Sequence, residues 1–272
     1  MKQCETKYPI LLLHGTGGRD DLPVGYWGRI PKALEDRGAV VFFGGQDAWA
    51  TVARNASKIR KTLAHLVEKH GVQKVNIIAH SKGGLEARHL ASGLGCGDRI
   101  ASITTISTPH HGSRTMDKLW RFPKLLFRVI GVPVNLWFSL LGDREADFFT
   151  ACGQLTTVYT ERFNLQNPDV KGIHYQSYAA AMKNPLSDIF MAFPNLVIDL
   201  VEGENDGMVT VSSAEWTNFR GVWRGKTRRG VSHGDAIDLR RKPLPKDKNG
   251  AVPFDAPTRY VDIVSELRER GL

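Results

Sequence analysis

The chain has 272 residues, which is long enough for one large domain with a buried core. Its composition, 42% hydrophobic and 24% charged residues, is typical of a globular protein and excludes a disordered or fibrous chain. Three cysteines are too few and too scattered for a disulfide framework or a zinc site. The net charge of +9 could attract nucleic acid or an anionic membrane. No nucleic-acid-binding motif accompanies the charge, so we predict a solvated basic surface and no nucleic-acid partner.

The sequence contains no pattern for export or for a membrane span. Residues 1–10 lack the apolar core of a signal peptide, so the chain as given is expected to be mature, leaderless or cytoplasmic. The most apolar stretch, residues 125–142, contains Arg128, Pro133 and Asn135. A transmembrane helix is therefore not predicted there.

The first predicted element is a strand at residues 8–13, a continuous apolar run of the kind that is buried on both faces of a parallel sheet. It ends in the glycine-rich loop His14-Gly15-Thr16-Gly17-Gly18. Such a loop can direct a backbone N–H toward negative charge that develops during a reaction. A phosphate-binding loop is the alternative, but neither the GK[ST] ending nor the GxGxxG spacing is present.

Strands and helices then alternate along the first half of the chain. We predict helices at residues 27–37, 52–70 and 85–91, and strands at residues 39–43, 75–78 and 100–106. This alternation indicates right-handed βαβ units and a mostly parallel sheet with helices on both faces. The sequence therefore predicts an α/β fold.

The junction between residues 78 and 85 contains Ala79-His80-Ser81-Lys82-Gly83-Gly84. A serine flanked by small residues between a strand and a helix is typical of a nucleophile elbow, although Ala79 replaces the usual first glycine. The turn would expose the Ser81 hydroxyl, and N–H groups at the start of the helix would face developing negative charge. An ordinary strand–helix turn that contains a serine is the alternative.

The alternation breaks after residue 112. Residues 116–141 are rich in Trp, Phe and Leu and are interrupted by prolines and a glycine. Two short core helices are one interpretation. We favour a helical cap, residues 113–165, inserted in a single domain of residues 1–272. The cap would line an apolar pocket and open at a lipid surface, with Trp120, Phe127, Trp137 and Phe138 as the predicted lining residues.

The second half of the chain is predicted to contain a helix at residues 156–163, a strand at 174–180 and a closing amphipathic helix at 258–270. Residues 188–201 fit a helix or a strand, with Pro194 in the middle, and we predict a helix for the first half of this stretch. A polar loop at residues 202–209 and a second at residues 230–235 follow.

A serine nucleophile needs a base within hydrogen-bond reach, and in this architecture the order along the chain is Ser, acid, His. Only His233 follows the acidic loop, so it is the base if this order holds. Asp206, in an Asn-Asp-Gly turn, is the preferred acid, because it can orient the imidazole and stabilise the imidazolium. Three nearby carboxylates are the alternatives: Asp199, Glu202 and Glu204.

Five segments occur in the order found in bacterial true lipases: residues 10–18 (ILLLHGTGG), 79–84 (AHSKGG), 107–112 (STPHHG), 205–209 (NDGMV) and 232–235 (SHGD). On these segments the chain resembles the α/β-hydrolase family of triacylglycerol lipases, nearest to the Pseudomonas, Burkholderia and Proteus type. The resemblance extends from residue 8 to about residue 239 and implies an α/β-hydrolase fold with a helical cap.

Carried over by position, the resemblance implies that Ser81 is the nucleophile, Asp206 the acid and His233 the base. It also implies that the backbone N–H groups of Thr16 and Lys82 form the oxyanion hole. Gln or Met is commoner than lysine at position 82, but only the N–H is needed there. The charge of the Lys82 side chain would act beside the site, on an anionic transition state or on a nearby carboxylate.

The resemblance further implies a structural calcium ion beside the histidine loop, with Asp235 as one ligand and Asp188 as a second. The glutamine expected further along is absent, and its place falls near Leu239. Calcium prefers six or more oxygen ligands. No cofactor is required for the predicted chemistry, and a structural calcium is the one ion that the resemblance allows.

These observations predict a serine carboxylic ester hydrolase, a lipase that acts on acylglycerol or fatty acyl esters through an acyl-enzyme. A short-chain esterase, a polyester depolymerase, a thioesterase and an acyltransferase are alternatives on the same triad. A non-catalytic binding protein on this fold would be expected to have a broken triad, whereas all three positions are filled. Lipases of this type act outside the cell, while residues 1–10 contain no export signal, so the sequence leaves the compartment open.

Overall fold

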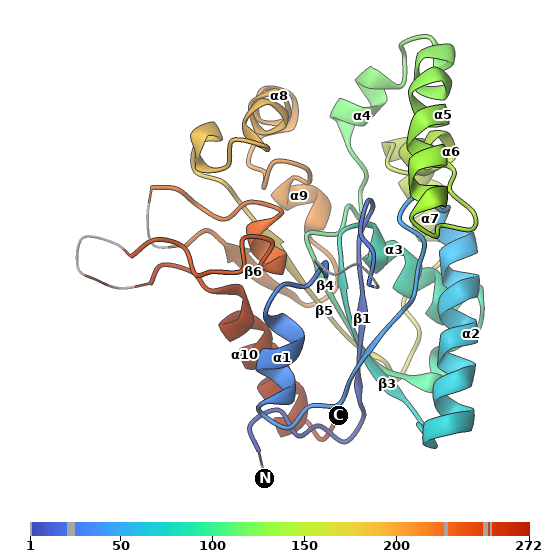
Figure 1. Ribbon diagram of the computed structural model, residues 1–272, viewed down its shortest axis with the longest axis vertical. Helices are drawn as coiled ribbons and strands as arrows, with labels where there is room; N and C mark the ends of the chain where they lie inside the picture. The colour runs from blue at the N-terminus through green and yellow to red at the C-terminus, as the bar shows by residue number, and fades with distance from the viewer. Residues whose placement is uncertain (1, 21–24, 226–227, 247–249, 251) are drawn as a thin grey trace.

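The computed structural model describes residues 2–20, 25–225, 228–246, 250 and 252–272. Its centre is a twisted sheet of six strands in the order β2-β1-β3-β4-β5-β6, in which every neighbouring pair is parallel (Figure 1). The strands are β1 (Ile10–Leu13), β2 (Val41–Phe43), β3 (Val75–His80), β4 (Ile100–Ile106), β5 (His174–Ala180) and β6 (Phe219–Trp223).

Helices cover both faces of this sheet. Helices α1 (Ile30–Glu35) and α10 (Ala256–Glu269) pack on one face, and α2 (Val52–His70) and α3 (Lys82–Arg88) pack on the other. Because successive side chains of a strand point to opposite faces, Ile10 and Leu12 join the α1–α10 core, and Leu11 and Leu13 join the α2 core. Burial on both faces explains the continuous apolar run of β1, and the predicted α/β fold is confirmed.

Most predicted elements are present, with bounds that lie within about three residues of the prediction. Two differences are larger. The strand β6 was not predicted, because its five residues, FRGVW, include a central glycine and a charged side chain. The helix predicted for the first half of residues 188–201 begins later, as α8 (Ala192–Glu202). Pro194 lies in the first turn of α8, where a missing N–H breaks no helical hydrogen bond.

The predicted cap, residues 113–165, corresponds to four helices, the last of which ends one residue later: α4 (Arg114–Leu119), α5 (Lys124–Leu140), α6 (Phe148–Gly153) and α7 (Thr157–Gln166). Helix α5 continues through Pro133 and buries only Gly131. Most of its large apolar side chains are solvent-exposed, so α5 is not a core helix. These helices and α8 lie at the carboxyl end of the parallel strands, where loops of α/β folds form binding sites (Figure 1). None of the helices in the described part of the chain is long and apolar enough to span a membrane.

Candidate active site

Ser81 lies at a sharp turn between β3 and α3. Its φ is +55° and its ψ is −134°, a conformation that residues other than glycine rarely adopt. Such strain is found at functional sites that the surrounding structure holds in place. A Cβ on Gly83 would lie 2.5 Å from the His14 carbonyl oxygen, and one on Gly84 would lie 2.1 Å from Thr108 Oγ1. Only glycine fits at these two positions, so the local geometry is that of a nucleophile elbow.

The glycine-rich loop after β1 lies directly against the serine. A Cβ on Gly15 would lie 2.6 Å from Ser81 Cβ and 3.2 Å from Ser81 Oγ. Thr16, the next residue, is therefore close to the serine. Lys82 is the first residue of α3, so its N–H is one of those that an α-helix leaves without an internal acceptor. Both predicted oxyanion donors thus belong to segments that meet at Ser81.

His233 and Asp206 are brought together from two loops that follow α8 and β6. His233 Nδ1 lies 2.7 Å from Asp206 Oδ2, and the side chain of Asp206 is fully buried. The other carboxylate oxygen of Asp206 accepts the N–H groups of Met208 (3.0 Å) and Val209 (2.8 Å). The imidazole of His233 faces that of His80, the neighbour of Ser81, with ring centroids 4.3 Å apart. The acid–histidine pair therefore lies beside the nucleophile elbow.

The alternative acids have other contacts. Glu202 accepts hydrogen bonds from Ser113 Oγ (2.8 Å) and the Thr115 N–H (2.6 Å) at the base of α4. Glu204 forms an ion pair with Arg224 at the surface, with an N–O distance of 2.6 Å. Asp199 is exposed on α8. Of the four candidates, Asp206 is the one in contact with His233.

Tyr26 and His80 complete the site and were not predicted from the sequence. Burial raises the pKa of Tyr26, so its hydroxyl stays protonated and can donate to His80 Nδ1, 2.7 Å away. Burial and the neighbouring His233 lower the pKa of His80 well below its usual range, so His80 stays neutral. A Cβ on Gly15 would also lie 2.8 Å from the Tyr26 hydroxyl oxygen. The tyrosine thus packs on the loop that carries Thr16, a contact between segments that no local pattern indicates.

The side chain of Lys82 acts on a nearby carboxylate, one of the two roles that the sequence left open, and not on the reacting atoms. It points into the protein, where its ammonium group pairs with Glu86 one helical turn later and donates to the Ala50 carbonyl oxygen at 2.7 Å. Glu86 also accepts from Gln46 Nε2 (2.7 Å) and Asn55 Nδ2 (2.8 Å). Gln46 Nε2 in turn lies 3.2 Å from the His14 carbonyl oxygen. The Lys82–Glu86 pair therefore joins the helix of the elbow, through Gln46, to the glycine-rich loop.

Replacing Lys82 by methionine should lower the free energy of unfolding by about 3–5 kcal/mol, measured by urea denaturation. Both partners of the Lys82–Glu86 pair are only 1% exposed, and the substitution removes the positive charge that pairs with the buried Glu86 carboxylate. The matched control is Lys32→Met, in an exposed pair with Asp36 at the same i,i+4 spacing, which should change stability little. Equal effects of the two substitutions would contradict a structural role for the buried pair.

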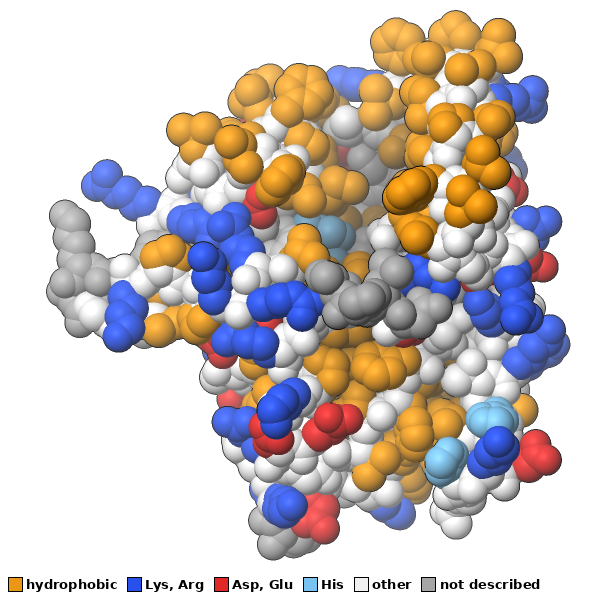
Figure 2. Space-filling model, in the orientation of Figure 1, with side chains coloured by type: hydrophobic (Ala, Val, Ile, Leu, Met, Phe, Trp, Pro, Cys, Tyr) orange, Lys and Arg blue, Asp and Glu red, His pale blue; other side chains and the backbone are white. Residues whose placement is uncertain are grey.

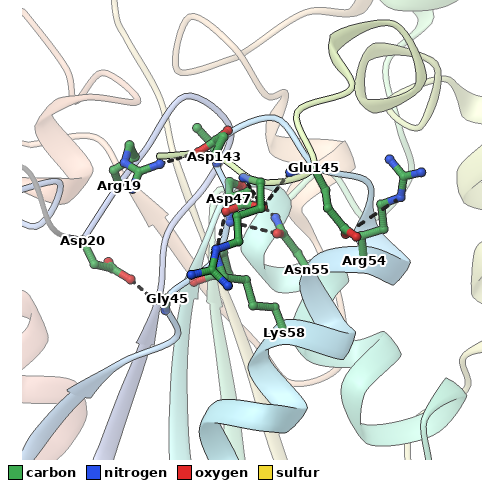
Figure 3. Close-up of polar contacts among 12 residues, drawn as sticks. Arg19, Asp20, Gly45, Asp47, Arg54, Asn55, Lys58, Asp143 and Glu145 are labelled. Carbon is green, nitrogen blue, oxygen red and sulfur yellow. Dashed lines mark hydrogen bonds and ion pairs between the residues drawn. The ribbon is translucent and has the colours of Figure 1, made fainter. Parts of the chain in front are cut away.

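Two carboxylates connect the residues that follow α5 to the loop before α2 (Figure 3). Asp143 accepts from Arg19 Nη1 at 2.6 Å and from the N–H groups of Ala48 and Trp49 at 3.0 and 3.1 Å. Asp47 in return accepts the N–H groups of residues 144 and 145, each at 3.2 Å, and pairs with Lys58. Because Arg19 directly follows the glycine-rich loop, these contacts join that loop to the base of α5.

The four predicted pocket residues fall into two groups. The ring of Trp120 packs against that of Phe127, with centroids 4.9 Å apart, and the ring of Phe138 packs against that of Trp49 at 6.1 Å. The side chain of Trp137 is 61% exposed and faces solvent on α5. Trp137 is therefore placed to contact a surface outside the molecule rather than the interior of a pocket.

The two predicted calcium ligands, Asp188 and Asp235, lie near each other beside the histidine loop, and both contact arginine side chains. Within the described ranges, no three His, Cys, Asp or Glu side chains form a group that could hold a metal ion.

Comparison with known proteins places the chain in a family. Residues 8–130 match the alpha/beta hydrolase fold family. Triacylglycerol lipase 2 of Saccharomyces cerevisiae is 29% identical, over 81% of this chain and 64% of its own length. A triacylglycerol lipase of Vibrio cholerae is 30% identical, over 77% of this chain and 74% of its own length. The chain belongs to the α/β-hydrolase family of triacylglycerol lipases.

Some relatives are longer than this chain, and solved structures of lipases share its fold. The chain spans about half of a Burkholderia plantarii triacylglycerol lipase, 49% of its length at 32% identity. The crystal structure of Staphylococcus hyicus lipase matches with a TM-score of 0.69, covering 98% of both chains at 18% sequence identity. Lipase 1 from Pelosinus fermentans matches with a TM-score of 0.65 at 16% identity, covering 97% of this chain and 99% of its own. At these identities the similarity shows that this member of the lipase family shares their fold.

Proposed function

We propose that the protein is a serine carboxylic ester hydrolase, a lipase that cleaves acylglycerol or other fatty acyl esters through an acyl-enzyme. The observation that carries the proposal is the hydrogen bond between His233 and the buried Asp206, beside the strained Ser81. A nucleophile, a base and an orienting acid are the groups that acyl transfer requires. The chain's membership of a family of triacylglycerol lipases supports an ester as the substrate.

In the proposed reaction, Ser81 Oγ attacks the ester carbonyl carbon while His233 Nε2 takes the hydroxyl proton. The N–H groups of Thr16 and Lys82 stabilise the oxyanion of the tetrahedral intermediate. The bond to the leaving alcohol then breaks, and His233 returns the proton to the alcohol oxygen. Water, deprotonated by His233, then attacks the carbonyl carbon of the acyl-enzyme. The bond from this carbon to Ser81 Oγ breaks, His233 returns the proton to Ser81 Oγ, and the acid is released. Asp206 holds the proton on Nδ1 throughout, which leaves Nε2 free to accept.

Two exposed apolar surfaces support a lipid as the partner. The α5 ridge consists of Leu125, Leu126, Val129, Ile130, Val132, Leu136, Trp137 and Leu140, which are 45–75% exposed. The α8 ridge consists of Leu186, Ile189, Phe190, Phe193, Leu196 and Leu200, which are 47–87% exposed. Figure 2 shows these apolar surfaces on either side of a hollow in which a histidine side chain is visible. Exposed patches of this kind mark interaction sites, and we propose that both ridges rest on a lipid–water interface.

The proposed activity predicts hydrolysis of p-nitrophenyl esters, with kcat/KM rising from acetate to palmitate because a longer acyl chain has more apolar surface to bury. An emulsified triacylglycerol should also be hydrolysed, and a serine-directed phosphonate should add once to Ser81, as measured by mass spectrometry. An optimum at acetate without triacylglycerol hydrolysis would indicate a short-chain esterase instead of a lipase. A preference for an acyl thioester or for transfer to an alcohol would favour the thioesterase or the acyltransferase. Failure of the phosphonate to react would contradict the catalytic proposal.

The lipid-surface proposal predicts that the double variants Leu125→Ser/Leu136→Ser and Phe190→Ser/Phe193→Ser each bind phospholipid vesicles about 10-fold more weakly or worse, since each buried large side chain contributes roughly 1.5–3 kcal/mol. Vesicle co-sedimentation is the measurement. Val40→Ser is the control, because Val40 is 57% exposed but precedes β2 at the opposite end of the sheet. Turnover of the soluble acetate ester should be unchanged in all variants. Unaltered vesicle binding by both double variants would refute the role of the ridges.

A further inference from the structure

Two carboxylates and a carbonyl oxygen gather beside the catalytic histidine loop, a set of oxygen atoms suited in type to a hard cation. Asp188 precedes α8, and Asp235 lies two residues after His233. Ser232 links them, because its hydroxyl donates to Asp188 Oδ2 at 2.7 Å and its N–H donates to Asp235 Oδ2 at 3.1 Å. The carbonyl oxygen of Ser187 completes the set.

Arginine side chains already occupy these oxygens. Arg240 places Nε 2.9 Å from Asp235 Oδ1 and Nη2 3.3 Å from Asp188 Oδ2, so one guanidinium bridges both carboxylates. Arg229 places Nη2 2.9 Å from Asp235 Oδ2. The Ser187 carbonyl oxygen accepts from Arg229 Nε at 2.6 Å and from Arg240 Nη2 at 3.4 Å. The remaining carboxylate oxygen, Asp188 Oδ1, accepts the Phe190 N–H at 3.2 Å.

The charges balance without a metal. Two carboxylates carry two negative charges, and two guanidinium groups supply the two positive charges that a divalent cation would otherwise bring. The carboxylates are also well shielded, since the side chain of Asp235 is 2% exposed and that of Asp188 is 10% exposed. A cation entering between them would have to displace both arginines and would meet their positive charge.

We propose that Arg229 and Arg240 take the place of a divalent cation between Asp188 and Asp235, so that this chain holds its His233 loop without calcium. The same contacts tie the His233 loop to the segment before α8, because Asp188 lies in that segment. Phe190 and Phe193 of the α8 ridge follow Asp188 closely. The arginines are positioning residues: they fix the loop that carries His233 and touch no reacting atom.

The first test is the melting temperature of the parent protein in excess calcium chloride, in magnesium chloride and in EDTA. We expect the same melting temperature in all three, and an unchanged rate of ester hydrolysis. A rise in the melting temperature specific to calcium, or a fall in EDTA, would overturn the proposal. Only the rate depends on the proposed function, so the melting temperatures decide the question even if the protein proves not to hydrolyse esters.

The second test is the variant Arg229→Gln/Arg240→Gln, which keeps hydrogen-bond donors but removes both charges. We expect its melting temperature to fall by roughly 5 °C or more, because two shielded carboxylates lose their counter-charges. Calcium should partly restore this melting temperature, whereas magnesium, which requires a tighter octahedral shell, should do so less. The control is Arg224→Gln, which breaks the more exposed pair with Glu204 and should change the melting temperature by no more than about 2 °C.

Two outcomes of the second test would contradict the proposal. If the double variant melts at the temperature of Arg224→Gln, the arginines do not hold the loop. If calcium leaves the melting temperature of the double variant unchanged, the oxygens do not form a cation site that the arginines fill. Should the double variant fail to fold, the single variant Arg240→Gln carries the same comparison, because Arg240 is the residue that bridges both carboxylates.

Discussion

Replacing Ser81 by alanine should abolish ester hydrolysis, with a fall in kcat on the order of 10⁶-fold, because no other group can form the acyl-enzyme. The fold should be retained. Alanine at position 81 faces the same unfavourable φ as serine, and the contacts of Gly15, Gly83 and Gly84 with the elbow are unaffected. The measurement is the rate of p-nitrophenyl ester hydrolysis beside an unfolding curve for each protein.

Ser57→Ala is the matched control, since it makes the same chemical change on α2, away from the elbow. It should hydrolyse esters at the parental rate and react with the phosphonate. If Ser81→Ala were as active as Ser57→Ala, the mechanism proposed here would be wrong. A stable Ser81→Ala protein without activity would instead assign the loss to the missing hydroxyl.

Replacing Asp206 by asparagine should lower kcat by about 10⁴-fold while leaving the protein folded. Both carboxylate oxygens of Asp206 act as acceptors, one from His233 Nδ1 and one from the N–H groups of Met208 and Val209. An amide has only one acceptor oxygen. If that oxygen faces the two N–H groups, the NH₂ group faces Nδ1 and favours the tautomer with its proton on Nε2. Nε2 then cannot accept the proton of Ser81.

Glu204→Gln is the control for Asp206→Asn. Glu204 lies two residues away and pairs with Arg224 at the surface, so its neutralisation should leave kcat within about 2-fold of the parent. Steady-state kinetics with p-nitrophenyl esters would show both effects. A larger loss in Glu204→Gln than in Asp206→Asn would reverse the assignment of the acid.

The sequence was most informative where structure follows from neighbouring residues. Helix α2, with its N-terminal Thr51 cap and Gly71 in the left-handed conformation at its end, has the predicted bounds. The same holds for β4 and β5. The elbow was predictable for the same reason, since small residues around a serine are a local steric requirement. The pairing of His233 with Asp206 followed from the order of segments along the chain, although nothing in either loop by itself indicates that the two side chains meet.

Tertiary structure decided the features that depend on partners far apart in the chain. Arg19 and Asp143 are 124 residues apart, and Asp188 and Ser232 are 44 residues apart. The sequence located Lys82 in the elbow but not the direction of its side chain, which is set by a counter-charge on the next helical turn and a carbonyl oxygen from the loop before α2. It also indicated two carboxylates near the histidine loop, but not that two arginines would reach them. Local patterns fix backbone conformation because they act through neighbouring residues, whereas the partner of a charged side chain depends on which segments the folded sheet brings together.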